Sequence, residues 1–599
     1  MNKEFKMKES LDFAISGAEI EIADKSVQMA LNAGASAVMV SLDKAKTEIY
    51  ALLDGEIDNI RQTGDRSLTF NIYADGKYGT FSTNRFEEES LRDFLCKAVE
   101  TVRMLVADPF RGLPDKKDLA TDAVNGDEMG LCWYGYDSVS RDEKLEMAKR
   151  VSVFGEFSAP SSDRNWRVVS EEVEYNNTLS DTYLTSSDGC RCRQTETSFE
   201  VSSQVTVEDN AGNKYSGLWW DYGVSPEKVL TSECGRKAVE MAVMQIAPVN
   251  ADKGKYTMVV SRLVSGRLLQ PVLNALSSLS IYQKSSFLVD ALGKQVFSKG
   301  LNVMDMPLEK GKSGAILFET DGRASRNREI ITDGVVKENF TSIYMSRKLG
   351  IPPTSSCPNR PVLLPFVAEE LLAGERGGGH CGVSGAGLDG SGLGGDCGGV
   401  SGDGLGAVNG DGRGVELGAV NGAELGEMSG CGLGGDCGDV FGAVSGGERG
   451  VELGAVSGDG RGIERGVVNG GGRGVELCVV NGGGRGTELA GGLGAERGLK
   501  SDLFVNEIAQ KDILELCGSG ILVTDFNGGN CNSATGDFSY GVSGFLFENG
   551  KITTPIDSML ITGNMTDLWS NLLAAGSDPV PGMSRQVPTL AFRDVTFNA

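Results

Sequence analysis

The sequence predicts a mixed α/β fold of the α+β type, built as two domains. Stretches of alternating apolar residues end at Asp-Gly or Asn-Gly pairs, a pattern typical of β-hairpins because both turn residues take positive φ. Amphipathic segments with helical spacing lie between these stretches. A glycine-rich segment then interrupts the second half of the chain. We therefore expect an N-terminal α+β domain at 1–250, a β-rich C-terminal domain at 251–365 and 499–599, and an insertion at 373–498.

The start of the chain predicts a compact unit of two helices and several strands. Small apolar residues at helical spacing predict a helix over 20–33, and a second helix over 88–106 carries its apolar residues on one side. Between the two helices we expect, in order, a strand over 36–42, a strand over 47–53, a turn at Asp54-Gly55, a strand in which Leu68, Phe70 and Ile72 alternate, and a turn at Asp75-Gly76.

The next part of the chain combines helices with long strands. We expect a helix over 140–157, strands rich in Thr, Val and Tyr over 166–220, and a helix from Ser225-Pro226-Glu227 to about residue 246. That tripeptide supplies a hydroxyl cap, a proline at the first helical position and an acid in the first turn.

The predicted C-terminal domain opens with a buried strand over 256–260 and a helical pattern over 263–279. Pro271 lies inside that pattern, so the helix must begin near it or kink there, because an interior proline costs about 3 kcal/mol. The later expectations are short strands and turns over 301–350, a helix over 502–516, a hairpin at Asn549-Gly550 after Phe545–Phe547, a short helix capped by Thr566-Asp567 and running to Leu573, and a strand over 589–597.

Charge and composition exclude several classes of function. The net charge of −25 argues against nucleic-acid binding, which usually requires a basic patch. The sequence has neither an apolar run long enough to span a membrane nor an N-terminal signal peptide, so we expect a cytoplasmic protein. Thirteen cysteines at irregular spacings do not form a secreted disulfide scaffold. Cys190 and Cys192 should share one face of a strand, as a structural thiol pair.

The segment from 373 to 498 has an unusual composition. It holds 48 of the 84 glycines, 17 acidic and 8 basic residues, and no proline or lysine. A 12-residue unit repeats in tandem from Gly442–Leu453 onward, with an earlier copy at Gly406–Leu417. So few large apolar groups cannot offset the backbone entropy, and we expect disorder. The alternative is a thin β-solenoid in which the regular Val and Leu stack.

Ten short signatures occur in the order and spacing of one known family. They are Ala33–Ala37, Asp54–Ile57, Asp75–Ser82, Ser285–Phe287, Leu292-Gly293, Asp305–Pro307, Phe318–Gly322, Gly334–Lys337, Gly536–Ser539 and Glu548–Gly550. Over about residues 20–360 and 500–599 the chain resembles the TldD/PmbA family of zinc peptidases.

The resemblance also identifies what this chain lacks. TldD-type chains of that family carry an His-Glu-x-x-x-His helix and a later cysteine that hold zinc, and the glutamate activates water. Here Leu268, Leu269 and Leu273 stand where the two histidines and the glutamate would be. No His or Glu occurs from 261 to 289, and Gly582–Arg585 replaces the stretch with the cysteine. We therefore expect no catalytic residue and no metal ligand in this chain.

This pattern resembles the PmbA (TldE) type, which implies a cytosolic heterodimer with a TldD-like zinc peptidase subunit. The partner would hold the zinc and hydrolyse unfolded or modified peptides, and this chain would help to shape the peptide-binding space. Gly536, Asp537, Phe538 and Ser539 could line a peptide channel, or they could form a turn that holds two strands. A link to DNA gyrase modulation belongs to the family and is not visible in these residues.

Other chemistries have weaker support. The single histidine, His380, lies in the glycine-rich segment, where a preorganised Ser-His or Cys-His pair is not expected. Asp321-Gly322 and Asp333-Gly334 fit turns better than paired catalytic carboxylates. Two alternatives stay open: a scaffold or binding protein that uses the glycine-rich repeat, and an independent hydrolase of unknown mechanism.

Overall fold

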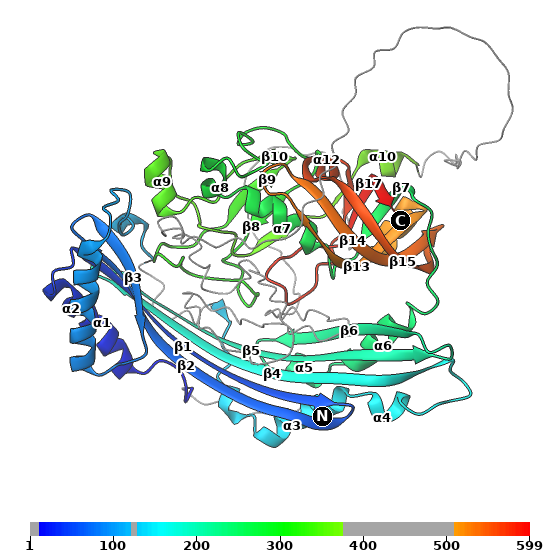
Figure 1. Ribbon diagram of the computed structural model, residues 1–599, viewed down its shortest axis with the longest axis horizontal. Helices are drawn as coiled ribbons and strands as arrows, with labels where there is room; N and C mark the ends of the chain where they lie inside the picture. The colour runs from blue at the N-terminus through cyan, green and yellow to red at the C-terminus, as the bar shows by residue number, and fades with distance from the viewer. Residues whose placement is uncertain (1–10, 121–128, 375–507, 599) are drawn as a thin grey trace, which may run out of the picture.

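The computed structural model describes residues 11–120, 129–374 and 508–598 (Figure 1). Within them, helices and three β-sheets confirm the predicted α+β class with a β-rich C-terminal part. The glycine-rich insertion predicted at 373–498, its repeats and His380 lie outside the described residues, except for Ala373 and Gly374, which end a helix. No helix among the described residues is both long and apolar enough to cross a membrane.

The first sheet has six antiparallel strands in the order β3-β2-β1-β4-β5-β6. Its strands are β1 (Ala37–Leu53), β2 (Glu56–Ala74), β3 (Lys77–Thr83), β4 (Trp166–Ser186), β5 (Arg191–Asp209) and β6 (Lys214–Gly223). The prediction of separate strands at 36–42 and 47–53 is wrong, because β1 continues through the charged residues between them. Lys44 pairs with Glu19 at 3.2 Å and Lys46 with Glu48 at 2.7 Å, so these charges lie on the sheet without interrupting it.

Helices cover one face of this sheet. Leu68, Phe70 and Ile72 are fully buried beneath α1 (Gly17–Asn32) and α2 (Glu88–Met104), as their alternation predicts. Further along the same face lie the 3-10 turn at Tyr136–Ser138 and the helices α3 (Arg141–Val151), α4 (Phe154–Phe157), α5 (Glu227–Leu230) and α6 (Cys234–Val243). The 3-10 turn at Lys116–Asp118 is followed by Leu119, which packs against the opposite face of the sheet, beside Met39 and Phe318. The helix-covered face consequently supplies the apolar core of the N-terminal half.

Two helices predicted as continuous are divided in the structure. The helix expected over 140–157 ends at Val151, because the buried carboxylate of Glu171 accepts the backbone N–H groups of Val153 and Phe154 at 2.9 and 3.0 Å. The helix expected over 225–246 divides into α5 and α6. Between them, Ser232 Oγ accepts the N–H of Cys234 at 3.1 Å and donates to Asp221 at 2.8 Å. Distant strand residues therefore decide both breaks.

The C-terminal half contains the other two sheets. The four-stranded sheet has the order β10-β9-β8-β11 and the seven-stranded sheet the order β12-β16-β17-β15-β14-β13-β7, with a further pairing of β17 to β7 that closes part of it into a ring. The strands are β7 (Gly254–Val260), β8 (Val303–Asp305), β9 (Arg328–Thr332), β10 (Val335–Val336), β11 (Pro361–Leu363), β12 (Phe366–Val367), β13 (Gly520–Cys531), β14 (Asp537–Glu548), β15 (Lys551–Asn564), β16 (Leu572–Ala575) and β17 (Leu590–Asn598).

The helices of this half are α7 (Gly266–Ala275), α8 (Ser278–Tyr282), α9 (Ile343–Leu349), α10 (Glu369–Gly374), α11 (Gln510–Cys517) and α12 (Met565–Ser570). Helix α9 was not expected within 301–350, and Pro271 lies inside α7. Asn564, rather than Thr566, caps α12, because its side chain accepts the N–H of Thr566 at 3.0 Å. The helix predicted to reach Leu573 stops at Ser570, since Leu572 and Leu573 enter β16 beside β17.

The two halves contact each other at one end of the six-stranded sheet. Gln194 of β5 donates to the carbonyl of Ala315 and accepts the N–H of Leu317, both at 3.0 Å. The buried thiols of Cys190 and Cys192 lie 3.5 Å apart beside them and are free, which confirms that they share one face of the strand, while a purely structural role stays a prediction. The domain boundary near residue 250 stays a prediction.

Candidate functional site

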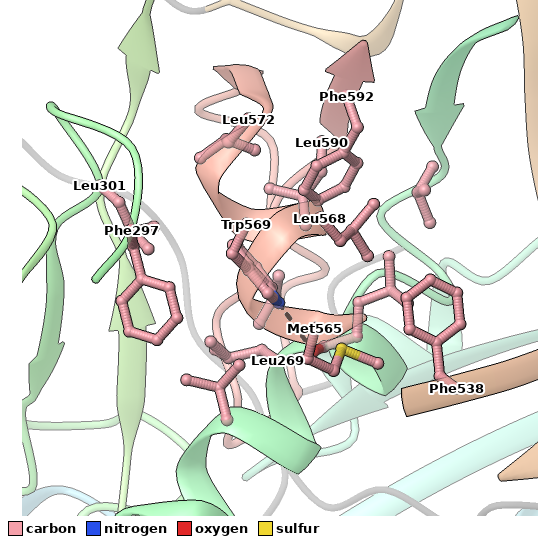
Figure 2. Packing of buried hydrophobic residues seen from close by; sticks show 14 of the residues in the cluster. Leu269, Phe297, Leu301, Phe538, Met565, Leu568, Trp569, Leu572, Leu590 and Phe592 are labelled. Carbon is pink, nitrogen blue, oxygen red and sulfur yellow. Dashed lines mark hydrogen bonds between the residues drawn. The ribbon is translucent and has the colours of Figure 1, made fainter. Parts of the chain in front are cut away.

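Helix α7 occupies the place where the resemblance puts a zinc-binding helix. Leu268, Leu269 and Leu273 are at most 1% exposed and pack in the largest apolar cluster of the C-terminal half. Figure 2 shows Leu269 beside Met565 and Trp569 of α12, with Phe538 of β14 next to them. Leucine side chains have no lone pair for a metal, and the cavity that a zinc and its water would fill is occupied by packed hydrocarbon.

The other residues of a zinc site are also missing. No histidine lies within the described residues, and Ser584, in the stretch where the cysteine is expected, is a buried hydroxyl. Helix α7 instead directs its polar residues outward, where Gln270 donates to Asn274 at 2.6 Å and Arg267 donates to the carbonyl of Phe526 at 2.8 Å. The residues present therefore do not fit zinc.

The Gly536–Ser539 segment joins three parts of the C-terminal half. Gly536 has φ +79° and its carbonyl accepts the N–H of Met565 at 2.8 Å, at the start of α12. Asp537 is exposed, and its carboxylate accepts hydrogen bonds from Asn564 at 3.0 Å and Thr535 at 2.7 Å. Those two hydrogen bonds lower the pKa of Asp537.

The next two residues of that segment differ in exposure. Phe538 is 5% exposed and stacks on Tyr540 with ring centroids 5.5 Å apart, whereas Ser539 is half-buried. This turn thus has a clear structural role, and contact of Gly536–Ser539 with a peptide stays a prediction.

A buried ionic cluster lies between β8, β9 and β11. Asp305 accepts the N–H groups of Asn359 and Arg360 at 3.0 and 2.6 Å and forms an ion pair with Arg328. Glu319 lies 3.7 Å from Arg328, but burial outweighs this attraction and raises the pKa of Glu319 to about 7. Both acids belong to predicted family signatures, yet their adjacency was not predicted, because 13 residues of loop and turn separate β8 from Glu319 in the sequence.

The turn-forming interpretation of Asp321-Gly322 and Asp333-Gly334 agrees with the backbone. Gly322, Asp333 and Gly334 have φ of +83°, +50° and +73°, and the Asp321 carboxylate accepts from Arg323 Nε at 2.9 Å. The Asp321 carboxylate is therefore used in an ion pair within the fold, and the backbone of Asp333 forms part of a turn.

The six-stranded sheet has a second face, which we call the polar sheet face. In Figure 1 helices α3 and α4 lie below the sheet, and the C-terminal strands β13, β14 and β15 lie above its other side. Successive side chains of a strand point to opposite faces, so the strand register shows which residues share this upper side. They are the odd positions of β1 (Ser41 to Leu53) and β2 (Asn59 to Asn71) and the even positions of β4 (Glu172 to Thr182) and β5 (Gln194 to Gln204).

Hydroxyl, amide and carboxylate groups dominate the polar sheet face. Thr47 and Thr178 share a hydrogen bond of 3.0 Å across β1 and β4, and Asp43 accepts from Thr182 at 2.7 Å. A sheet face lined with such groups can hydrogen-bond a polar chain but cannot form a dry core. The alternation of polar residues over 172–182 and 194–204 is visible in the sequence and could have indicated this face.

Models of known protein families match two parts of the chain. A family model for the PmbA/TldA metallopeptidase C-terminal domain matches residues 253–364 and 500–599, and the model for the central domain matches residues 134–246. Together the two models span more than half of the chain. The chain belongs to the PmbA/TldD family.

Individual relatives of the PmbA/TldD family extend the match. The metalloprotease PmbA of Escherichia coli O157:H7 is 21% identical over 527 residues, which cover 88% of this chain and 84% of that protein. The PmbA homologue of Haemophilus influenzae is 25% identical over 335 residues, or 55% of this chain and 70% of the relative. A zinc metalloprotease TldD homologue from Saccharolobus solfataricus is 28% identical over a shorter stretch of 104 residues, 17% of this chain and 23% of the relative.

Solved structures of other proteins share the fold of this chain. A Bacteroides thetaiotaomicron protein described as a modulator of DNA gyrase superimposes with a TM-score of 0.70 at 24% identity and covers 98% of this chain and 100% of its own. TldE from Thermococcus kodakarensis superimposes with a TM-score of 0.60 at 12% identity, over 96% of this chain and 100% of its own. At these identities the likeness establishes the fold alone.

Proposed function

We propose that this chain is a TldE-type subunit that does not catalyse hydrolysis itself and pairs with a TldD-like zinc peptidase in the cytoplasm. The observation that carries the proposal is the packing of Leu268, Leu269 and Leu273 in an apolar core at the positions of the family's zinc helix. Zinc chemistry needs histidine, cysteine or carboxylate ligands, so the reaction would take place in the partner.

In the proposed complex, this chain contributes surface for the peptide. The polar sheet face offers hydrogen-bonding groups to an extended chain, and a folded subunit that holds them in place lowers the entropy cost of peptide binding. The Gly536–Ser539 turn, at the start of β14, is proposed as a second contact. Peptides that are unfolded or modified are the proposed substrates, and the zinc is expected in the partner subunit.

The first experiment is peptide hydrolysis combined with metal analysis, on the purified chain and on its mixture with the TldD-like chain of the same organism. The proposal predicts no zinc and no hydrolysis for the chain alone, co-purification of the two chains, and hydrolysis by the mixture. Hydrolysis by the isolated chain that survives chelators and a His380→Ala substitution would establish an independent hydrolase instead. Failure of the two chains to co-purify would contradict the pairing.

The Gly536–Ser539 contact has its own test. The Ser539→Ala substitution removes a half-buried hydroxyl that has no hydrogen-bond partner in the described part of the chain. Unfolding should be unaffected, while hydrolysis by the mixed complex should fall by up to about tenfold if the hydroxyl bonds the peptide. An unchanged rate would remove Ser539 from the proposed contact.

A further inference from the structure

A cavity of about 270 Å³ opens on the polar sheet face at the end of the sheet formed by the β1–β2 hairpin. Residues from five strands line it: Ala51, Leu52, Leu53, Asp58, Asn59, Arg61, Glu172, Val173, Glu174, Ser202, Gln204 and Leu218. Small-molecule pockets usually measure roughly 300–1,000 Å³, so this volume suits one long side chain and a few waters. The cavity lies outside the α7 region and outside the Gly536–Ser539 turn.

The lining combines apolar and acidic groups. Ala51, Leu53 and Leu218 supply hydrocarbon, and Leu53 remains 42% exposed. Asp58, Glu172 and Glu174 supply carboxylates, while Arg61 is the basic residue of the lining. The Arg61 guanidinium lies 4.0 Å from Glu174, so it pairs with one of the three carboxylates of the lining.

Asp58 and Glu172 make no side-chain hydrogen bond or ion pair with the residues that the structure describes. Asp58 is the extra residue at a bulge, because Ala51 pairs with Asn59 while Leu52 pairs with Ile57. The bulge and the adjacent Glu172 position of β4 therefore bring two carboxylates without partners to one cavity.

The surrounding surface has the same sign of charge. The polar sheet face as defined above carries the carboxylates of Asp43, Asp65, Glu172, Glu174, Glu196 and Glu200 and the guanidinium of Arg61. A concave surface with one dominant sign of charge concentrates its field and attracts ligands of the opposite sign. The net charge of −25 adds to this attraction at long range.

We propose that this cavity binds the lysine or arginine side chain of an extended peptide, so that the subunit favours cationic peptides. The inference rests on the proposed function in taking a peptide as the ligand. The aliphatic stem of the basic residue packs against Leu53 and Leu218, as long basic side chains do on apolar surface, and its cation pairs with Asp58 and Glu172. Neighbouring peptide groups hydrogen-bond to Asn59, Ser202 and Gln204.

The test measures peptide binding by fluorescence anisotropy, with the full chain and no partner. The probes are an unstructured nonapeptide with three lysines and a neutral dye, and the same peptide with glutamine in place of each lysine. The lysine peptide should bind more tightly, and its affinity should fall as salt rises. The D58N/E172Q variant should bind it about tenfold more weakly at low salt, because two charge pairs are lost.

The matched control is D93N/E100Q, which removes two exposed carboxylates from α2 and should bind like the unmodified chain. Equal binding of both peptides, or equal binding by D58N/E172Q and the control, would overturn the inference. So would loss of pairing with the TldD-like chain in D58N/E172Q, because the cavity would then belong to the subunit contact. Pairing and hydrolysis are measured separately, so the proposed function can survive failure of this inference.

Discussion

The indole nitrogen of Trp569 donates a hydrogen bond of 3.2 Å to the main-chain carbonyl of Leu268, 301 residues earlier in the sequence (Figure 2). Both residues are fully buried, and the Trp569 ring packs edge-on against Phe592 of β17 with ring centroids 5.4 Å apart. This contact joins α12 to α7. The helix that would carry zinc in a TldD-type chain is thus held in place here by the apolar core.

The Trp569→Phe substitution should lower the free energy of unfolding by about 1–3 kcal/mol. It removes the donor to Leu268 and leaves a small void beside Phe592. Urea unfolding followed by circular dichroism measures the change. Trp220→Phe, at a half-exposed site in β6, is the control and should cost much less. Equal losses in the two variants would show that the buried hydrogen bond contributes little.

Truncation of Leu269 tests whether α7 serves as core. Leu269→Ala should cost about 2–5 kcal/mol, because it opens a cavity among tightly packed neighbours. The same substitution at Leu292, which is 54% exposed, provides the comparison and should have little effect. The midpoints of chemical denaturation decide the outcome. A loss below about 1 kcal/mol at Leu269 would mean that the positions of the zinc helix are loosely packed.

Alanine at Gly536 should destabilise the turn at the start of β14. Gly536 has φ +79°, and an added Cβ would lie 3.1 Å from the Phe287 ring. Strain and crowding together should cost about 2 kcal/mol or more. Gly76→Ala shares the positive φ, at +71°, but meets no atom within 4 Å, so the difference between the two variants isolates the crowding at Phe287. Equal melting temperatures for both variants would contradict this explanation.

Glu319 should make stability depend on pH. Its folded pKa of about 7 lies above the ordinary value of 4.5, because burial disfavours the carboxylate. The protonated Glu319 therefore adds to the free energy of unfolding, and this stabilisation is fully present below about pH 4.5. It is lost as the pH rises through 7, and the loss amounts to a value on the order of 3 kcal/mol. Unfolding free energies at pH 5 and pH 8 measure this loss.

Two variants complete the Glu319 measurement. Glu319→Gln keeps one oxygen that can accept from Asn359, and its NH2 group can donate to the Ser355 hydroxyl, so it should remove most of the decline between pH 5 and pH 8. Glu548→Gln, at an exposed position, should retain the decline seen in the unmodified chain. An identical pH dependence in all three proteins would assign the effect to other groups.

Deletion of residues 373–498 should leave the fold intact. Leu371 before the insertion and Ile508 after it pack against the same apolar cluster, so the two ends of the chain lie close together. Loop entropy changes by only about 0.6 kcal/mol for each doubling of length, so the shortened chain should be as stable or up to about 2 kcal/mol more stable. Calorimetry and co-purification with the TldD-like chain measure the outcome.

A longer deletion of residues 366–507 provides the contrast. It also removes β12 and α10, including the pairing of Phe366 with Ala575, and it should lower the melting temperature. If the shorter deletion instead abolished pairing, the glycine-rich repeat would be a working part of the protein, as the scaffold alternative holds.

The sequence by itself determined the features that depend on one residue and its immediate neighbours. The turns at Asp54-Gly55, Asp75-Gly76 and Asn549-Gly550 all have positive φ, because backbone sterics restrict that region to a few residue types. The absence of zinc ligands from α7 likewise follows from the chemistry of leucine. The alternation of apolar residues also predicted that Leu68, Phe70 and Ile72 lie in the core, because alternate side chains of a strand point to the same face.

Only the tertiary structure decided the features that depend on groups distant in sequence. Glu171 ends α3 by accepting N–H groups across 18 residues, and β4 and β2 together keep β1 continuous. The cavity beside Asp58 and Glu172 exists because a bulge and a neighbouring strand meet at one end of the sheet. Local preferences are worth a few tenths of a kcal/mol per residue, whereas buried hydrogen bonds and packing are worth several times more, so long-range contacts prevail where the two conflict.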